Sequence, residues 1–288
     1  MSNQSIREYG HPLQFRALPL REQNSYKYWS KLYRQVWKRL HQEKAVLDRE
    51  FQYALEPEGF PPIDVDDVVN RFARRHVIRR IDRLIPELST TLTFWVVPGP
   101  YESDTQSHDE IIEHKIELHK KRTEIQHKLG NAMVTMVHLA SMGTEFTFST
   151  KLTQVKDWNG KRLKQDEGEI DIVLISFKRN KTYGIEAKNV APIIDSGYAR
   201  AKLRKHFDNC DKLGMTPVFV LSRIFSTTSD ELEQAGATVV ETKTQFYQLR
   251  YWPIAKSLKQ SLGYHFVRRM GHHASVHRLS SQLVQKLK

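Results

Sequence analysis

The stretch 168-GEIDIVLISFKRNKTYGIEAK-188 contains two runs rich in β-forming residues on either side of a short polar turn. We predict a hairpin with a two-residue turn at Arg179-Asn180, which places Asp171 opposite Lys188. Side chains alternate between the two faces of a strand, so Glu186 and Lys188 point to the same face, and a directly paired residue shares that face. The hairpin therefore predicts that Asp171, Glu186 and Lys188 converge.

Hydrophobic packing does not readily explain three charged residues on this face of the hairpin. The neighbouring positions Ile170, Ile172 and Ile185 are apolar, and a charge buried among them is unfavourable without a partner or a metal ion. Two close carboxylates repel each other and attract a hard divalent cation such as Mg²⁺, and a lysine beside them can stabilise charge on a phosphate. This set suits metal-assisted phosphodiester hydrolysis. The alternative is an edge hairpin whose polar face is in water and whose ion pair contributes little.

The spacing of these residues resembles a known signature. In this chain, Asp171 is followed by fourteen residues and then by Glu186-Ala187-Lys188. This arrangement is similar to the active-site motif of the restriction-endonuclease-like nucleases, the PD-(D/E)xK superfamily. The resemblance covers about residues 125–242. It implies an α/β fold with a mixed sheet flanked by helices. It also implies that Asp171 and Glu186 hold Mg²⁺, or Mn²⁺ in its place, and that Lys188 completes the catalytic site.

The chain departs from this signature in two ways. Ile170 stands where many members have a proline. Many members also add a glutamate from the preceding helix, and residues 130–135 contain none. Glu124, earlier in the chain, and Glu145, later, are the candidates for an additional metal ligand. For Glu124 a helix-surface position is the alternative. Glu169 is a further candidate, because it shares the strand face of the first acid by parity.

The charge of the chain favours a polyanionic partner. Lys and Arg total 45 against 33 acidic residues, a formal net charge of +12, and residues 242–288 contain no Asp or Glu at all. A field of one sign over such a length favours DNA or RNA, and the alternative is a basic surface that only keeps the protein soluble. The basic residues expected to contact DNA are Arg75, Arg79, Arg200, Lys202, Arg204, Lys205, Arg268 and Arg269.

Three regions are expected along the chain. Residues 1–120 form a mainly helical region suited to DNA recognition, residues 121–242 form the nuclease-like core, and residues 243–288 form a basic helical extension. Within the first region, apolar residues at spacings of three and four predict one helix from Tyr28 through Phe51. A second helix is expected from Asp64 to Leu84, with Arg71, Arg75 and Arg79 on one face.

Together these features predict an Mg²⁺-dependent DNA endonuclease in phage defence or restriction, DNA repair or recombination. The alternatives are a non-catalytic nucleic-acid-binding protein on a nuclease-like fold, and the nuclease subunit of a larger transposition or restriction complex. A homodimer is expected, because many members cut two strands with two sites. We expect no nucleotide cofactor, no membrane span and a cytoplasmic location. The single cysteine, Cys210, excludes a disulfide framework and is expected to be a buried thiol.

Overall fold

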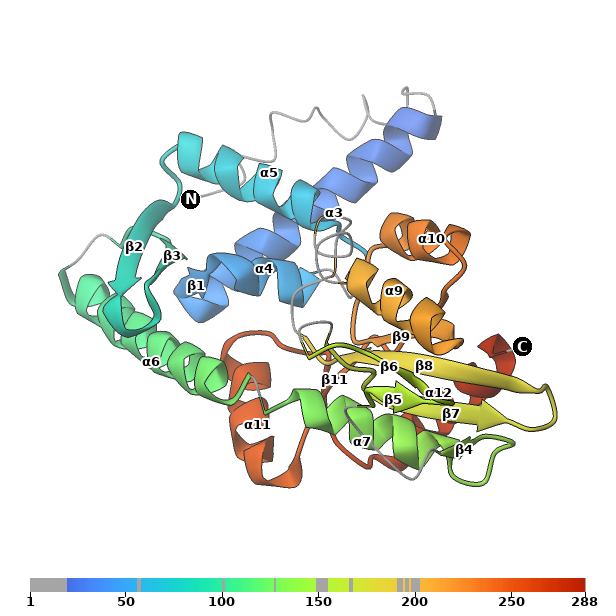
Figure 1. Ribbon diagram of the computed structural model, residues 1–288. Helices are drawn as coiled ribbons and strands as arrows, with labels where there is room; N and C mark the ends of the chain where they lie inside the picture. Colours follow the sequence, from blue (N-terminus) through green and yellow to red (C-terminus); the bar gives the residue numbers. More distant parts are fainter. Residues whose placement is uncertain are drawn as a thin grey trace. The chain divides into compact units, whose positions relative to one another are not determined.

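The computed structural model describes residues 20–55, 58–99, 102–126, 128–148, 155–165, 168–190, 194, 197 and 203–287 (Figure 1). The chain is mixed α/β, as the sequence predicts, and divides into two compact units. Unit 1 consists of Met1–Lys120 and Ser257–His265, and unit 2 of Lys121–Lys256 and Phe266–Lys288. No helix in the described ranges is long and apolar enough to cross a membrane.

Unit 1 combines helices with a small antiparallel sheet. Its strands lie in the order β1-β3-β2. Its core is formed by apolar residues of the helices α3, α4 and α5 and by Val46, Phe60, Ile78 and Trp95. The elements are α3 (Leu20–Glu43), β1 (Ala45–Leu47), α4 (Asp48–Leu55), α5 (Pro62–Arg74), β2 (Arg79–Ile85), the short 3₁₀ helix η2 (Pro86–Leu88), β3 (Thr90–Val96) and α6 (Glu102–Gln126).

Two helix predictions in this unit are wrong at their C-terminal ends. The first helix stops at Glu43, because Lys44 adopts a left-handed conformation with φ of 58° and the next three residues pair with β3. The second helix stops at Arg74. His76 is also left-handed, and the following segment becomes β2, which pairs with β3 along its full length. Arg79 therefore lies on a strand and does not share a helix face with Arg75.

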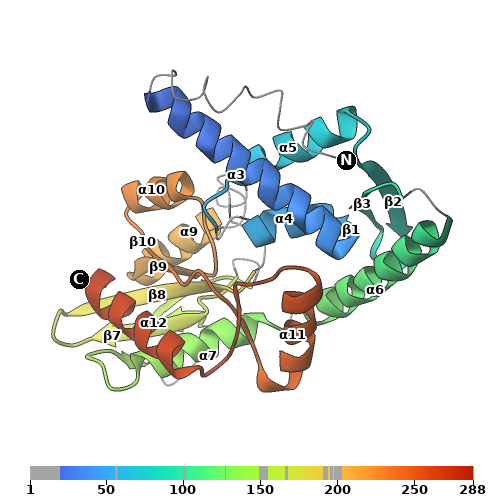
Figure 2. The ribbon, with the colours of Figure 1, turned by 180° about the vertical axis from the view of Figure 1, so that it is seen from behind.

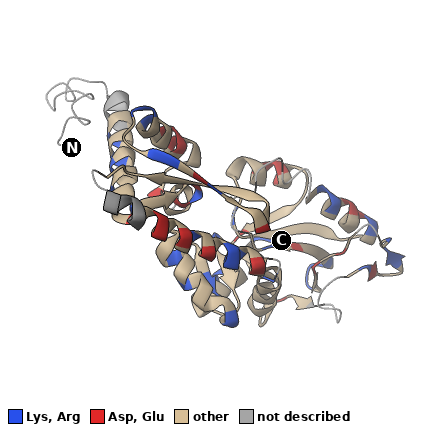
Figure 3. Ribbon diagram, turned by 90° about the vertical axis from the view of Figure 1, so that its left-hand side faces the viewer, with Lys and Arg blue, Asp and Glu red and all other residues tan. Residues whose placement is uncertain are grey.

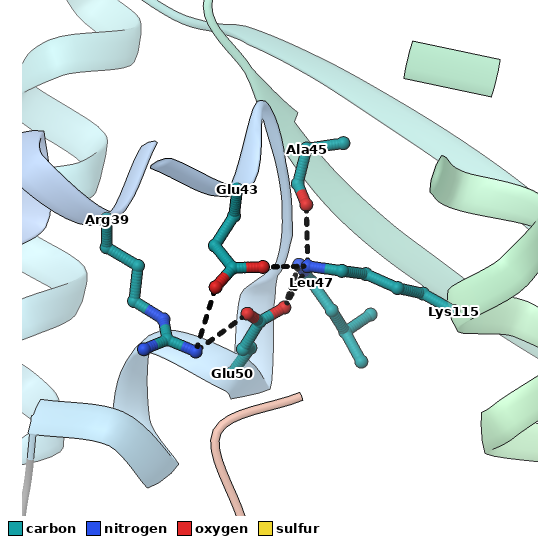
Figure 4. A network of polar contacts seen from close by, with 6 residues as sticks. All are labelled: Arg39, Glu43, Ala45, Leu47, Glu50 and Lys115. Carbon is teal, nitrogen blue, oxygen red and sulfur yellow. Dashed lines mark hydrogen bonds and ion pairs between the residues drawn. The ribbon is translucent and has the colours of Figure 1, made fainter. Parts of the chain in front are cut away.

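A buried ion network joins several elements of unit 1 (Figure 4). The Lys115 ammonium on α6 donates to Glu50 Oε2 and to the carbonyl of Ala45, both at 2.7 Å. Arg39 on α3 donates to the other oxygen of Glu50 at 2.9 Å. The backbone N–H of Leu47 also donates to Glu50. Because Lys115 and Glu50 are buried, the network links α3, β1, α4 and α6 where water is excluded.

Unit 2 contains a five-stranded mixed sheet in the order β10-β9-β8-β7-β4. The strands β4, β7 and β8 are antiparallel neighbours, whereas β8, β9 and β10 run parallel. The elements are α7 (Gly130–Ser141), β4 (Thr147–Phe148), β5 (Asp157–Trp158), β6 (Lys161–Arg162), β7 (Ile172–Ser176), β8 (Lys181–Lys188), α9 (Arg204–Leu213), β9 (Thr216–Leu221), α10 (Ser226–Gln234), β10 (Thr238–Glu241), β11 (Gln245–Tyr247), the 3₁₀ helix η4 (Leu249–Tyr251), α11 (Trp252–Ser261), β12 (Val267–Arg269) and α12 (His273–Lys286).

Helices cover both faces of this sheet (Figures 1 and 2). On one face, α7 and α12 pack against Leu174, Ile185 and Val220. On the other face, Val173 packs with Cys210 of α9, and Phe219 packs with Leu232 of α10. The alternation of core residues between the two faces follows the period of two that a strand requires.

The last region of the chain differs from the prediction. Residues 243–288 are not wholly helical, because β11 and β12 form a parallel two-stranded sheet, with Arg268 and Arg269 on β12. The region is also divided between the two units, since Ser257–His265 belongs to unit 1. Lys and Arg are distributed over helices and strands in both units and are interspersed with Asp and Glu (Figure 3).

Candidate active site

The hairpin of β7 and β8 is paired in a different register from the predicted one. Ser176 pairs with Lys181 and Ile172 with Ile185, so the turn contains four residues, and the predicted two-residue turn is wrong. The turn is wider because Asn180 is left-handed and the backbone N–H of Arg179 donates to the Ser176 hydroxyl at 3.3 Å. The pairing shifts by two positions, an even number, so every side chain keeps its predicted face.

The structure brings Asp171, Glu186 and Lys188 together. Asp171 immediately precedes β7, and its Oδ2 accepts a hydrogen bond of 2.8 Å from the backbone N–H of Ala187, the residue between the other two. Lys188 forms an ion pair with Glu186. The side chain of Glu186 is 12% exposed and that of Lys188 is 29% exposed. The three groups therefore meet at the end of β8, partly shielded from water.

The pKa of Asp171 is affected by burial and by the neighbouring carboxylate of Glu186. Burial raises the pKa of Asp171, and the nearby negative charge of Glu186 raises it further. The Ala187 N–H and the charge of Lys188 oppose this rise only in part. A divalent cation between the carboxylates would relieve the repulsion that raises this pKa, and carboxylate oxygens are the ligands that Mg²⁺ prefers. The two acids therefore fit a metal ion chemically.

A buried histidine lies behind Glu186. His206 on α9 is hydrogen-bonded through Nε2 to the carbonyl of Gly184 at 2.9 Å, and its Nδ1 lies 3.7 Å from Glu186 Oε2. Burial lowers the pKa of His206 to about 4, so the imidazole is neutral at neutral pH. His206 was not predicted from the sequence to belong to the site. One feature of the sequence could have indicated its role. His206 lies four residues before Cys210, and this spacing places both on the buried face of the helix that follows the Glu186 strand.

The site opens into a pocket of about 260 Å³. Glu169 lines this pocket together with Asp171 and Lys188. Gln126 and Asn131 contribute amide groups that were not predicted from the sequence. The complete lining consists of Gln126, Gly130, Asn131, Val134, Glu169, Asp171, Ala187, Lys188, Asn189 and Val190. The pocket thus combines acidic, basic and amide groups around the catalytic candidates.

Asn189 holds the end of β8 in place. Its amide nitrogen donates to the carbonyls of Leu129 and Phe246, both at 2.7 Å, and its Oδ1 accepts from the N–H of Phe246 at 2.8 Å. Gln245 donates to the backbone carbonyl of Asn189 at 3.1 Å. These bonds connect the strand end to the segment before α7 and to β11. Lys188 is therefore adjacent to a residue that four hydrogen bonds anchor.

Of the candidates for an additional metal ligand, Glu169 lines the pocket, whereas Glu145 and Glu124 lie elsewhere. Glu145 forms an ion pair with Arg179 at 2.5 Å, beside the hairpin turn and thus at the opposite end of β7 and β8 from Asp171. Glu124 is exposed on α6 and does not line the pocket. Among the described residues, no three His, Cys, Asp or Glu side chains are grouped as a metal ion would require. Asp171 and Glu186 thus lie together, and Glu169 is the further acid that lines the same pocket.

The predicted DNA-contacting residues are spread over several elements. Arg204 and Lys205 are exposed on α9, and a Cβ atom at Gly168 would lie 3.9 Å from the Lys205 Nζ, so Lys205 lies beside the segment that leads to Asp171. In unit 2, β12 also exposes Arg268 and Arg269. In unit 1, Arg75 is the C-cap residue that follows α5 and Arg79 begins β2, and both are exposed. Arg200 and Lys202 lie outside the described residues.

A scan against protein-family models finds no match to this chain, and a search of curated proteins finds no significant relative.

Proposed function

We propose that the protein is a metal-dependent DNA endonuclease and that unit 2 has a restriction-endonuclease-like core. The observation that carries this proposal is the convergence of Asp171, Glu186 and Lys188 beside one pocket. The order of elements supports it, because α7 precedes the antiparallel strands and α9 leads into the parallel strand β9. We propose that it acts in restriction or phage defence, in DNA repair or in recombination. It would act alone, as a homodimer or as the nuclease subunit of a larger complex.

Each residue of the site has a distinct role in this proposal. Asp171 and Glu186 would hold Mg²⁺, which when bound polarises a phosphate and lowers the pKa of a water molecule. The Ala187 N–H keeps the Asp171 carboxylate oriented. Lys188 lines the pocket and is partly exposed, so its ammonium can reach a phosphate oxygen and stabilise the charge that develops during hydrolysis.

Cleavage of supercoiled plasmid tests the proposal directly. Wild-type protein should nick the plasmid with Mg²⁺ or Mn²⁺ and not with EDTA. Lys188→Ala should lower the rate by about 100-fold or more, since it removes a preorganised charge from the transition state. Asp171→Asn should abolish cleavage by weakening metal binding.

Lys178→Ala provides the matched control, because Lys178 lies in the turn of the same hairpin with its side chain 78% exposed. This variant should cleave like the wild type. Equal cleavage by Lys188→Ala and wild type would show that any activity comes from another site or from a contaminant.

A non-catalytic nucleic-acid-binding protein is the second candidate. It is favoured because, among the described residues, no three His, Cys, Asp or Glu side chains are grouped so that they could hold a metal ion. A nuclease loses cleavage with Asp171→Asn and keeps DNA binding in EDTA. A protein that only binds DNA shows binding without cleavage both as the wild type and as the Asp171→Asn variant.

A further inference from the structure

The first long helix of unit 1 has an uninterrupted basic face. Every position of the series 27, 31, 34, 38 and 41 on α3 is exposed. These residues are Lys27, Lys31, Arg34, Lys38 and His41. Spacings of three and four place them on one side of a helix, over about 21 Å at a rise of 1.5 Å per residue. We call this set the α3 basic stripe.

No negative charge interrupts the stripe within its own helix. Residues 23–42 contain no Asp or Glu. On α3, the ion pairs found among the described residues involve Arg39, and none of them involves Lys31, Arg34 or Lys38. Three cations with no internal counter-charge are available to an external polyanion.

The opposite face of α3 is buried in the core of unit 1. Leu32, Val36 and Leu40 are completely buried. The aromatic residues Trp29, Tyr33 and Trp37 lie between the two faces and pack partly against the same core. Since its apolar face is packed inside the unit, α3 cannot insert that face into a membrane, and the side that it exposes carries the basic stripe. Figure 2 shows α3 in the foreground of unit 1.

We propose that the α3 basic stripe binds the phosphate backbone of DNA. This inference rests on the proposed nuclease function for the choice of DNA as the polyanion, and it assigns part of substrate binding to unit 1. Lys and Arg on one helix face bind phosphates without reading sequence, so the stripe contributes affinity and position rather than base specificity.

The test compares two triple variants with equal loss of charge. The stripe variant carries Lys31→Gln, Arg34→Gln and Lys38→Gln. The control variant carries Arg49→Gln, Lys121→Gln and Lys259→Gln, which replace exposed residues of α4, α6 and α11. Binding of a short labelled duplex is measured by fluorescence anisotropy in EDTA over a series of salt concentrations.

The stripe variant should show a weaker salt dependence than the control. Each lost phosphate contact reduces the log–log slope by about 0.9, so three contacts reduce it by about 2.7. The KM for plasmid cleavage should rise while kcat is unchanged, because the site in unit 2 is intact. Circular dichroism should show the same helix content in both variants.

The outcomes separate this inference from the nuclease proposal. Equal slopes for the two triple variants would overturn the role of the stripe, even if the wild type cleaves DNA. A slope change without any wild-type cleavage would keep the stripe and reject the nuclease. If anionic vesicles, but not DNA, bind in a stripe-dependent way, the polyanion is a lipid surface and the inference is wrong.

Discussion

Gly184 lies where α9 comes closest to β8. A Cβ atom at this position would lie 2.6 Å from the Cys210 sulfur and 3.2 Å from the Met215 sulfur, both of which are buried. The carbonyl of Gly184 also receives the hydrogen bond of His206. The absence of a side chain here allows the helix to approach closely enough for His206 to lie against Glu186.

We therefore expect Gly184→Ala to lower the free energy of unfolding by about 1–3 kcal/mol, the usual effect of overpacking a core. Urea denaturation measures this change. Gly130→Ala is the control, since a Cβ atom there meets nothing within 4 Å and the residue lies in α7. An equal effect of both substitutions would show that close packing at Gly184 is not the cause.

The thiol of Cys210 should be unreactive in the native protein. The residue is completely buried, and burial raises its pKa to about 12. Only the thiolate reacts with a disulfide reagent, and almost none is present at pH 8. Ellman's reagent should therefore detect no thiol in the folded protein and one in guanidinium chloride. Rapid reaction of the folded protein would contradict the packing of α9 against β8.

The elements of unit 1 are held together by a charge cluster rather than by apolar contacts alone. Lys115 on α6 reaches Glu50 on α4 and the Ala45 carbonyl of β1, and Arg39 on α3 reaches the same glutamate (Figure 4). A buried pair gains little net stability over apolar residues, but removal of one partner leaves the other charge without compensation. The cluster thus specifies which elements meet.

We expect Lys115→Met to lower the free energy of unfolding by about 3–5 kcal/mol, as for other broken buried pairs. Addition of Glu50→Gln should restore part of this loss, because no carboxylate then remains buried beside Arg39. Thermal or urea unfolding measures both variants. Lys121→Met, at an exposed position of the same helix, is the control and should have little effect. A double variant as unstable as the sum of its single variants would show that the two residues are not coupled.

The hairpin of β7 and β8 shows which part of an element can be predicted. The strand period is a property of each residue's neighbours along the chain, so the shared face of Asp171, Glu186 and Lys188 followed from the sequence. The register depends on the turn, and Asn180 took a left-handed conformation that widened it. The prediction that the three side chains share a face remained correct, because the register shifted by an even number of residues.

The helices of unit 1 show the opposite case. The apolar pattern through Phe51 is continuous in sequence, but β3 offers backbone partners to residues 45–47 and the chain leaves the helix to pair with it. The same strand pairs with residues 79–85 on its other side. Local propensity was overridden in both places by hydrogen bonding to a strand that is distant in sequence.

At the scale of the whole molecule, the net charge of +12 indicated a polyanionic partner without locating it. The acid-free segment 242–288 drew attention to the C-terminal region, whereas the α3 basic stripe lies near the start of the described chain. Lys and Arg on that helix are separated in sequence by the apolar residues of its core face. Burial of Leu32, Val36 and Leu40 is what leaves the cations together on the other side.

Three features follow from the sequence alone: the α/β class, the strand face of the three candidate catalytic residues and the basic character of the chain. These features depend only on composition and on the periodicity of residues that are neighbours along the chain. The hairpin register, the approach of His206 to Glu186 and the pocket walls from Gln126 and Asn131 depend on segments far apart in the chain. Contacts of that kind arise only when packing and backbone pairing select one arrangement among many that the local pattern allows.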